Sequence, residues 1–328
     1  MLDDVSLIAL LVAMGLYAAA FIAFALDLAR RSALVADAAT ARQPSAVGAT
    51  AARRGGTATL ERQPASSGPD APVAAGRSIS LNVAMVMLVV GFVVHAVATV
   101  LRGLAASRVP WANMYEFAMT GTLLILSVYL IVLTRRDLRF LGTFVTGLIL
   151  ILLGIAVVQY RVEVSPLPPS LQSYWLVIHV FVAALGTGFF ALAFALSGVQ
   201  LLQFRRESLA ADAQAVKMRF LATLPDSVTL ESMAYRLNIV GFIFWTFTLM
   251  AGAIWAERAW GRYWGWDTKE VWTFIIWVLY AGYIHARATR GWRGSRSAWL
   301  AIIGFSAVMF NFGVVNVFFK GLHTYSGL

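Results

Sequence analysis

Apolar runs of about 20 residues recur along the chain, and each is long enough to cross about 30 Å of hydrocarbon as a helix. The runs lie roughly at 5–28, 79–101, 114–133, 140–159, 174–202, 238–256, 270–287 and 298–319. This pattern predicts an all-α polytopic membrane protein with about eight transmembrane helices. The first run opens with Asp3 and Asp4 and is followed by Arg30 and Arg31. That order is typical of a retained span with its N-terminus outside, and not of a cleaved signal peptide.

Composition supports the membrane assignment. Of the 328 residues, 60% are hydrophobic and 13% are charged, and the mean hydropathy is +0.75. A soluble domain carries about 25% charged residues, so this chain is too apolar to be a water-soluble globule. It contains no cysteine, which excludes disulfides, iron–sulfur clusters, thiolate metal sites and cysteine nucleophiles.

The basic residues predict the orientation. If the N-terminus lies outside, the segments on the inner side hold 19 of the 26 Lys and Arg residues. A strong excess of basic residues marks the inner face of a membrane, so both termini are expected outside. The net charge of +10 is then explained by this asymmetry, and a nucleic-acid partner is not expected.

The segments between the runs predict the domain organisation. We expect residues 1–30 to form the first transmembrane helix and 31–78, rich in Ala, Gly, Ser, Pro and Arg, to be a disordered cytoplasmic linker. Residues 79–328 are expected to form a seven-helix domain. Within it, 205–237 alternates apolar and charged positions and restarts a helical pattern at Pro225 and Asp226, which predicts amphipathic helices lying on the membrane surface.

A tryptophan-rich segment at 255–272 covers the predicted outer loop between helices six and seven. Five of the eleven tryptophans of the chain fall in it: Trp255, Trp260, Trp264, Trp266 and Trp272. One explanation is an aromatic belt at the headgroup level. A belt, however, distributes single aromatics over many helix ends, whereas here five lie in one loop with Gly261 and Gly265 between them. Flat indole faces in an irregular loop favour a large planar apolar ligand.

The chain has four histidines, and the predicted topology places two of them beside this segment. His179 lies near the outer end of span five, and His323 lies just past the outer end of span eight. His285 lies near the inner end of span seven, and His95 lies in the outer half of span two, where it is explained equally well as a packing residue. Imidazole is a common axial ligand of haem iron, and two ligands on opposite faces of the ring must come from different helices.

Other chemistries have little support in the sequence. It contains no GxxxxGK[ST] phosphate loop, no HExxH zinc motif and no GxSxG nucleophile elbow. Carboxylates typical of proton-coupled transport are scarce within the spans, where Glu116 and Asp27 lie near the ends.

The segment Trp260-Gly-Arg-Tyr-Trp264-Gly-Trp266-Asp267-Thr-Lys269-Glu270-Val-Trp272 resembles the tryptophan-rich "WWD" signature of haem-handling proteins. Within these, residues 80–328 are most similar to the CcsA/ResC family of cytochrome c biogenesis, which is also named CcsB. The similarity extends to segments at 110–117, 173–179, 280–285 and 321–325.

The resemblance implies a multi-pass protein of the plasma membrane that binds haem b as its cargo and presents it on the outer face. It also implies attachment of the haem to Cys-x-x-Cys-His of apocytochrome c together with a ResB/Ccs1-type membrane partner, and thiol-reducing proteins would keep the acceptor cysteines free. The chain would then be a component of a cytochrome c synthase, or haem lyase. By the same resemblance, His179 and His323 match the axial ligands to haem iron, and His285 matches a membrane histidine linked to haem passage. The other residues expected to bind the cofactor are Trp255, Trp260, Trp264, Trp266, Asp267, Trp272 and Arg262.

Two alternatives remain open at this stage. A haem transporter or exporter without ligation activity would bind haem in the same way, and only a product assay would distinguish it. A b-type cytochrome subunit would usually bury its histidine pairs inside a helix bundle, whereas the histidines beside this loop are expected at an exposed face, which favours transient loading of haem. The haem propionates also need cations, and Arg258, Arg262 and Lys269 are those of the loop, although solvation at the headgroups would explain them equally well.

Overall fold

The computed structural model describes residues 1–41, 78–167, 171–209, 221–289, 291–319 and 321–323. These residues form eight long helices, followed by one short helix. Their bounds are α1 Leu2–Ala41, α2 Ile79–Ala106, α3 Met114–Leu133, α4 Gly142–Gln159, α5 Tyr174–Ser208, α6 Ser227–Trp260, α7 Thr268–Thr289, α8 Ser295–Phe310 and α9 Asn316–Phe318. A 3-10 turn at Arg139–Leu141 precedes α4, and a π-helical segment at Asn311–Val315 joins α8 to α9.

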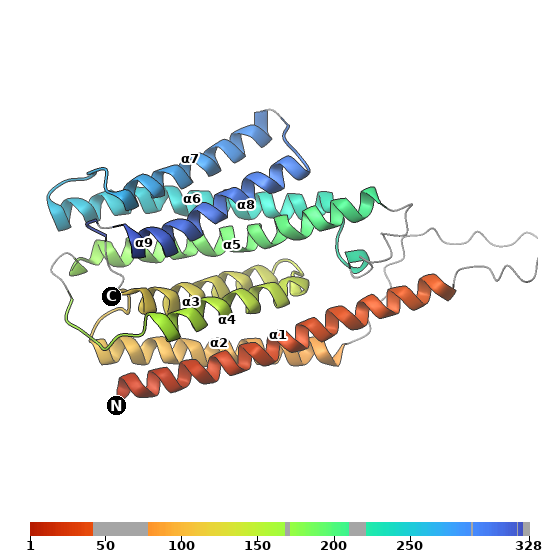
Figure 1. The fold of residues 1–328 in the computed structure, drawn as a ribbon, viewed down its shortest axis with the longest axis horizontal. Helices are drawn as coiled ribbons and strands as arrows, with labels where there is room; N and C mark the ends of the chain where they lie inside the picture. The colour runs from red at the N-terminus through yellow and green to blue at the C-terminus, as the bar shows by residue number, and fades with distance from the viewer. Residues whose placement is uncertain (42–77, 168–170, 210–220, 290, 320, 324–328) are drawn as a thin grey trace, which may run out of the picture.

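Successive long helices run in opposite directions along one bundle (Figure 1). The ends of α2, α4 and α6 and the starts of α3, α5 and α7 therefore lie at one end, which we call the tryptophan end. The start of α1 and the end of α9 lie at the same end (Figure 1). α1 packs along α2 and α4, α5 packs against α3, α6 and α8, and α7 packs against α6 and α8.

Seven of the eight long helices are long and apolar enough to span a membrane, the exception being α7. With 22 residues, α7 has the length of a span, and it lies alongside α6 and α8 (Figure 1). The all-α polytopic prediction is therefore confirmed, and the arrangement of the long helices agrees with about eight crossings.

Polar caps set the helix ends where the apolar runs alone do not. The side chains of Asn113, Ser173 and Asp226 accept hydrogen bonds from backbone amides in the first turns of α3, α5 and α6. At the other end of α6, Gly261 adopts φ +70°, a left-handed conformation that terminates the helix and opens the loop.

Two boundary predictions differ from the structure. α1 continues to Ala41, into the region predicted as linker, most of which lies outside the described residues. The prediction of amphipathic surface helices at 205–237 is wrong at 205–208 and 227–237, which belong to the long helices α5 and α6, while 210–220 lie outside the described residues. The helical restart at Asp226 is the N-cap of the long helix itself, since its carboxylate accepts from the Thr229 amide at 2.7 Å.

A buried ion network ties the helices together at the tryptophan end. Arg102 of α2 and Glu116 of α3 have no solvent exposure, and the Arg102 Nε donates to Glu116 Oε1 at 3.0 Å. The same guanidinium donates to Asp3 of α1 and to the Val162 carbonyl, while Arg108 donates to Glu116 Oε2 at 2.6 Å. Three helices and the 160–173 connection are thus joined through one arginine.

Replacing Arg102 with Met should lower the free energy of unfolding by about 3 kcal/mol, because removing one partner leaves a buried carboxylate undercompensated. The exposed pair of Arg139 and Asp137 provides the control, and Arg139→Gln should change stability by less than about 1 kcal/mol. Unfolding of both variants in detergent checks the difference. Equal losses would show that the Arg102 network does not stabilise the bundle.

The excess of basic residues on one side predicts that the tryptophan end faces outward. A reporter that is active only outside the membrane, fused after Leu328, should therefore be active, and one fused at the connection between α5 and α6 should not. The opposite pattern of activities would reverse the orientation.

Candidate functional site

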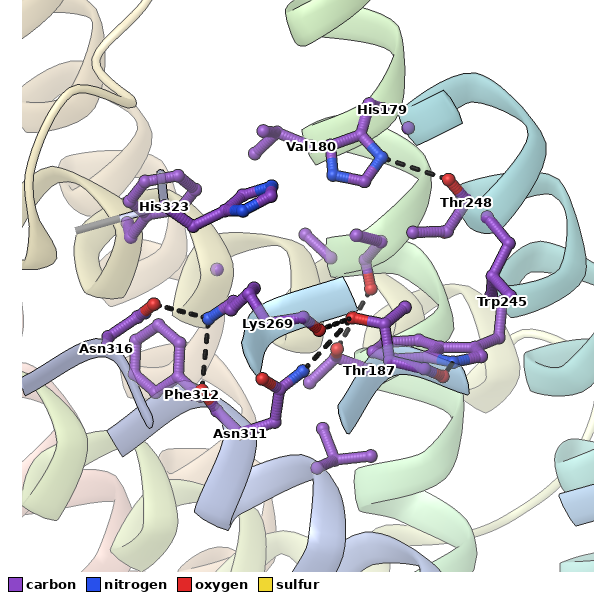
Figure 2. A pocket seen from close by; sticks show the side chains of 18 of the residues that line it. His179, Val180, Thr187, Trp245, Thr248, Lys269, Asn311, Phe312, Asn316 and His323 are labelled. Atoms are coloured by element: carbon purple, nitrogen blue, oxygen red, sulfur yellow. Dashed lines mark hydrogen bonds between the residues drawn. The ribbon is translucent and has the colours of Figure 1, made fainter. Parts of the chain in front are cut away.

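A cavity of about 220 Å³ lies near the tryptophan end, among α3, α5, α6, α7 and the end of α8. Most of its surface is apolar, and both His179 and His323 line it (Figure 2). The aromatic part of the lining comes from Trp245, Trp255, Tyr263, Trp264, Phe117 and Phe312. An apolar, aromatic pocket with few polar groups is the usual form of a small-molecule or cofactor site.

His179 lies in the second turn of α5 and is held between α6 and a tryptophan. Its Nδ1 lies 3.0 Å from the carbonyl oxygen of Thr248, and its ring stacks on Trp255 with centroids 5.8 Å apart. A carbonyl oxygen only accepts hydrogen bonds, so Nδ1 carries the proton, and the neutral ring keeps a lone pair on Nε2. Gly252 makes this close approach possible, because a Cβ at that position would lie 2.8 Å from the imidazole.

His323 belongs to the segment 321–323 beyond α9 and is held by the tryptophan loop 261–267. Its Nδ1 donates to Asp267 Oδ2 at 2.7 Å, and the Leu322 amide donates to Asp267 Oδ1 at 3.2 Å. The hydrogen bond from His323 lowers the pKa of the Asp267 carboxyl below its usual value. A carboxylate that accepts a hydrogen bond from Nδ1 orients the ring and leaves Nε2 available to bind a metal. This is the usual support of a metal-binding histidine.

Trp255 joins the two histidines. It is almost completely buried, stacks on His179 and contacts His323 edge-to-face at 5.4 Å. The two imidazole centroids are therefore at most about 11 Å apart, the sum of the two distances to Trp255. Trp260 contacts both rings, with its centroid 4.8 Å from that of Trp255 and 4.8 Å from that of His323. The structure thus brings two histidines that are far apart in the sequence onto one aromatic wall.

Glu270 fixes the tryptophan loop. Its buried carboxylate accepts hydrogen bonds from the backbone amides of Gly265 at 2.8 Å and Asp267 at 3.1 Å. Between them, Trp266 adopts φ +58°, outside the conformations that side chains prefer, and turns its indole outward. Trp264 faces the cavity instead, and the two rings meet edge-to-face at 5.9 Å.

The ten residues predicted to bind the cofactor therefore divide into three groups. His179, His323, Trp255 and Trp264 line the cavity, while Trp260 and Asp267 contact His323. Trp266, Trp272 and Arg262 are not part of the lining: Trp272 packs on Phe310, and the Arg262 guanidinium lies against Gly265. His285 is far from the cavity, about 24 Å along α7 from Lys269 by the helical rise, and it is exposed.

His95 does not reach this cavity. It is fully buried, and its Nδ1 lies 3.2 Å from the Tyr17 hydroxyl of α1. This contact supports a packing role between α1 and α2.

The structure adds polar residues that the sequence did not single out as site residues. Asn311 and Asn316, at the π-helical segment, line the cavity, and both bind the Lys269 ammonium. Single π-helical turns inside α-helices are frequent at functional sites. The sequence feature that could have indicated them is the presence of two asparagines in the largely apolar final run, since polar side chains within a span need a partner.

Comparison with known proteins agrees with this architecture. A family model described as cytochrome C assembly protein matches residues 111–323. The chain is 33% identical over 248 residues to the cytochrome c biogenesis protein CcsA of Heterosigma akashiwo, an alignment that covers 67% of this chain and 77% of the relative. The CcsA proteins of Guillardia theta and Prochlorococcus marinus are 35% and 30% identical and cover 69% and 76% of this chain, with 80% and 86% of their own lengths aligned.

Among solved structures, the fold is similar to that of a cytochrome c heme lyase CcmF, with a TM-score of 0.60 and 14% identity. All of this chain is covered, and it spans 50% of the length of that protein. The family model covers more than half of the chain, including both cavity histidines and the tryptophan loop. This chain therefore belongs to the cytochrome c assembly protein family, and it is a multi-pass membrane protein of cytochrome c biogenesis.

Proposed function

We propose that the chain binds haem b in the cavity at the tryptophan end, holds it at the outer face of the plasma membrane and, with a ResB/Ccs1-type partner, attaches it to Cys-x-x-Cys-His of apocytochrome c. The observation that carries the proposal is the pair His179 and His323. Each has its Nδ1 occupied by a protein acceptor and its Nε2 free, and both rings line one aromatic cavity.

Haem is the cargo, and the chain contributes binding and orientation. The imidazoles of His179 on α5 and of His323 beyond α9 would hold the iron through their Nε2 atoms, and Trp255 and Trp264 would offer flat apolar surfaces to the porphyrin. Keeping the ring at the rim of the bundle would place its vinyl groups within reach of an acceptor thiol, which is catalysis by proximity.

Attachment forms a thioether by adding the acceptor's S–H across a haem vinyl group. The sulfur bonds to the vinyl carbon next to the ring, and the hydrogen goes to the terminal carbon, so this step consumes no oxidant. The thiols belong to the apocytochrome, and the absence of cysteine from this chain is compatible with that chemistry. Thiol-reducing proteins would keep the acceptor cysteines free.

A covalent-product assay tests the proposed function. The chain is expressed with and without a ResB-like partner, together with a Cys-x-x-Cys-His reporter, and covalent haem on the reporter is measured. Attached haem that depends on both this chain and the partner is the expected result. Haem binding without any attached product, even with the partner present, would favour the alternative of a haem transporter.

Replacing His179 or His323 with Ala should remove one axial ligand. Haem occupancy should fall or its absorption spectrum should shift, and added imidazole should partly restore binding by filling the vacant position. Asp267→Asn, which keeps the size of the side chain but weakens the support of His323, should lower haem affinity by about 10-fold or more. Unchanged spectra and occupancy in both alanine variants would exclude the two histidines as ligands.

His285 is expected to act separately, on the path by which haem arrives. It is exposed on α7 far from the cavity, and an exposed histidine on a membrane helix favours a contact with a partner protein. His285→Ala should reduce the amount of haem at the outer site and leave the spectrum of the bound haem unchanged. An altered spectrum at full occupancy would assign His285 to structural support.

A further inference from the structure

Lys269 occupies a distinctive position in the cavity. It is the second residue of α7, and its side chain turns into the bundle, where it lines the same cavity as His179 and His323. Figure 2 shows its ammonium group between the two asparagines of the last helical segment, with the two imidazoles above it in this view. Nζ donates to the backbone carbonyl oxygen of Asn311 at 3.0 Å and to the side-chain Oδ1 of Asn316.

Both groups that hold this ammonium are neutral. Among the described residues, no carboxylate lies within ion-pair distance of the Lys269 Nζ. The two neighbouring acids are bonded elsewhere: Asp267 binds His323, and Glu270 binds the amides of the tryptophan loop. A buried ammonium without a counter-ion is costly, and two neutral acceptors compensate it only in part. An ammonium has three N–H donors, so one remains for a ligand.

The other two cations of the tryptophan segment are poorly placed to serve the cavity. The Arg262 guanidinium lies against Gly265 and is not part of the lining. The Arg258 side chain is 66% exposed and lies 3.6 Å from Glu257. Among the described residues that line the cavity, Lys269 is the only basic residue apart from the two histidines.

We infer that Lys269 is the carboxylate-binding group of the cavity and that it receives one propionate of the haem, which fixes the direction in which the macrocycle enters. This inference rests on the proposed function. The propionates and the vinyl groups of haem b lie on different edges of the ring. A propionate directed into the bundle at Lys269 therefore turns the vinyl groups away from the asparagines, toward the tryptophan loop. That is the edge an incoming thiol must reach.

Esterified haem tests the inference, because haem dimethyl ester keeps the iron and the vinyl groups but has no carboxylates. The full chain is purified in detergent with its partner, and the affinity for each porphyrin is measured from the absorption of the bound form. The unmodified protein should bind haem at least about tenfold more tightly than the ester, as expected for a charge-assisted hydrogen bond. Lys269→Met should lose most of this preference by weakening the binding of haem, and its affinity for the ester should stay unchanged.

Two further variants separate charge from folding. Lys269→Arg keeps a cation and should retain the preference for haem over its ester. Asn316→Asp places a carboxylate on Nζ with little change of size, so it should compete with the propionate and abolish the preference while the ester still binds. Arg262→Ala serves as the matched control outside the lining and should leave the preference intact.

The outcomes distinguish the inference from the proposed function. Equal affinity of the unmodified protein for haem and ester, with both still dependent on His179, would overturn the role of Lys269 and leave haem binding in place. A loss of ester binding in Lys269→Met as large as the loss of haem binding would show that the lysine only supports the fold of the π-helical segment. Absence of binding for both porphyrins in the unmodified protein would overturn the proposed function itself.

Discussion

The hydrogen bond from His323 to Asp267 connects the segment 321–323 to the loop between α6 and α7. The Leu322 amide donates to the other oxygen of the same carboxylate, and His323 packs edge-to-face on Trp255 and Trp260 at the end of α6. The loop itself depends on Glu270, which holds the amides on either side of Trp266. Asp267 and Glu270, three residues apart in the sequence, thus position His323 and the backbone turn at Trp266, and with them the cavity wall.

This arrangement explains why the cavity has few charges of its own. The carboxylates of Asp267 and Glu270 both accept hydrogen bonds from within the protein. The carboxylate of Glu116 is paired with Arg102 and Arg108. What remains on the lining is two imidazoles with a free Nε2 and one ammonium with neutral partners. Such a surface is complementary to a flat apolar ligand that carries both a metal and a carboxylate, which are the features of haem.

The helices, and the placement of His179 and His323 at the same end of the bundle, can be predicted from the sequence because both depend only on the spacing of the apolar runs. Apolar runs set the spans, alternation of direction puts the outer ends together, and a histidine near such an end meets the loop beside it. The directions of individual side chains do not follow in this way. Trp264 and Trp266 are two residues apart, yet one lines the cavity and the other turns outward, since the choice depends on a left-handed residue held by Glu270. The sequence pattern places Lys269 in the loop with the arginines, whereas in the structure α7 already begins at Thr268 and the Lys269 side chain turns into the cavity.

The composition of α7 differs from that of the other long helices. It is the one long helix too polar to count as a candidate span by its apolar content, although its length matches the hydrocarbon thickness. Three of its charged groups have polar neighbours inside the bundle: Glu270 accepts from the loop amides, Lys269 donates to Asn311 and Asn316, and the Arg287 Nε donates to Glu231 of α6 at 3.1 Å. Tyr280 is buried against Phe190 of α5 with ring centroids 3.6 Å apart. Such a helix can remain in a membrane bundle with less apolar surface, because these three charged side chains face neighbouring protein groups and not hydrocarbon. Exposed His285 is then the position on α7 where a contact outside this chain is most needed.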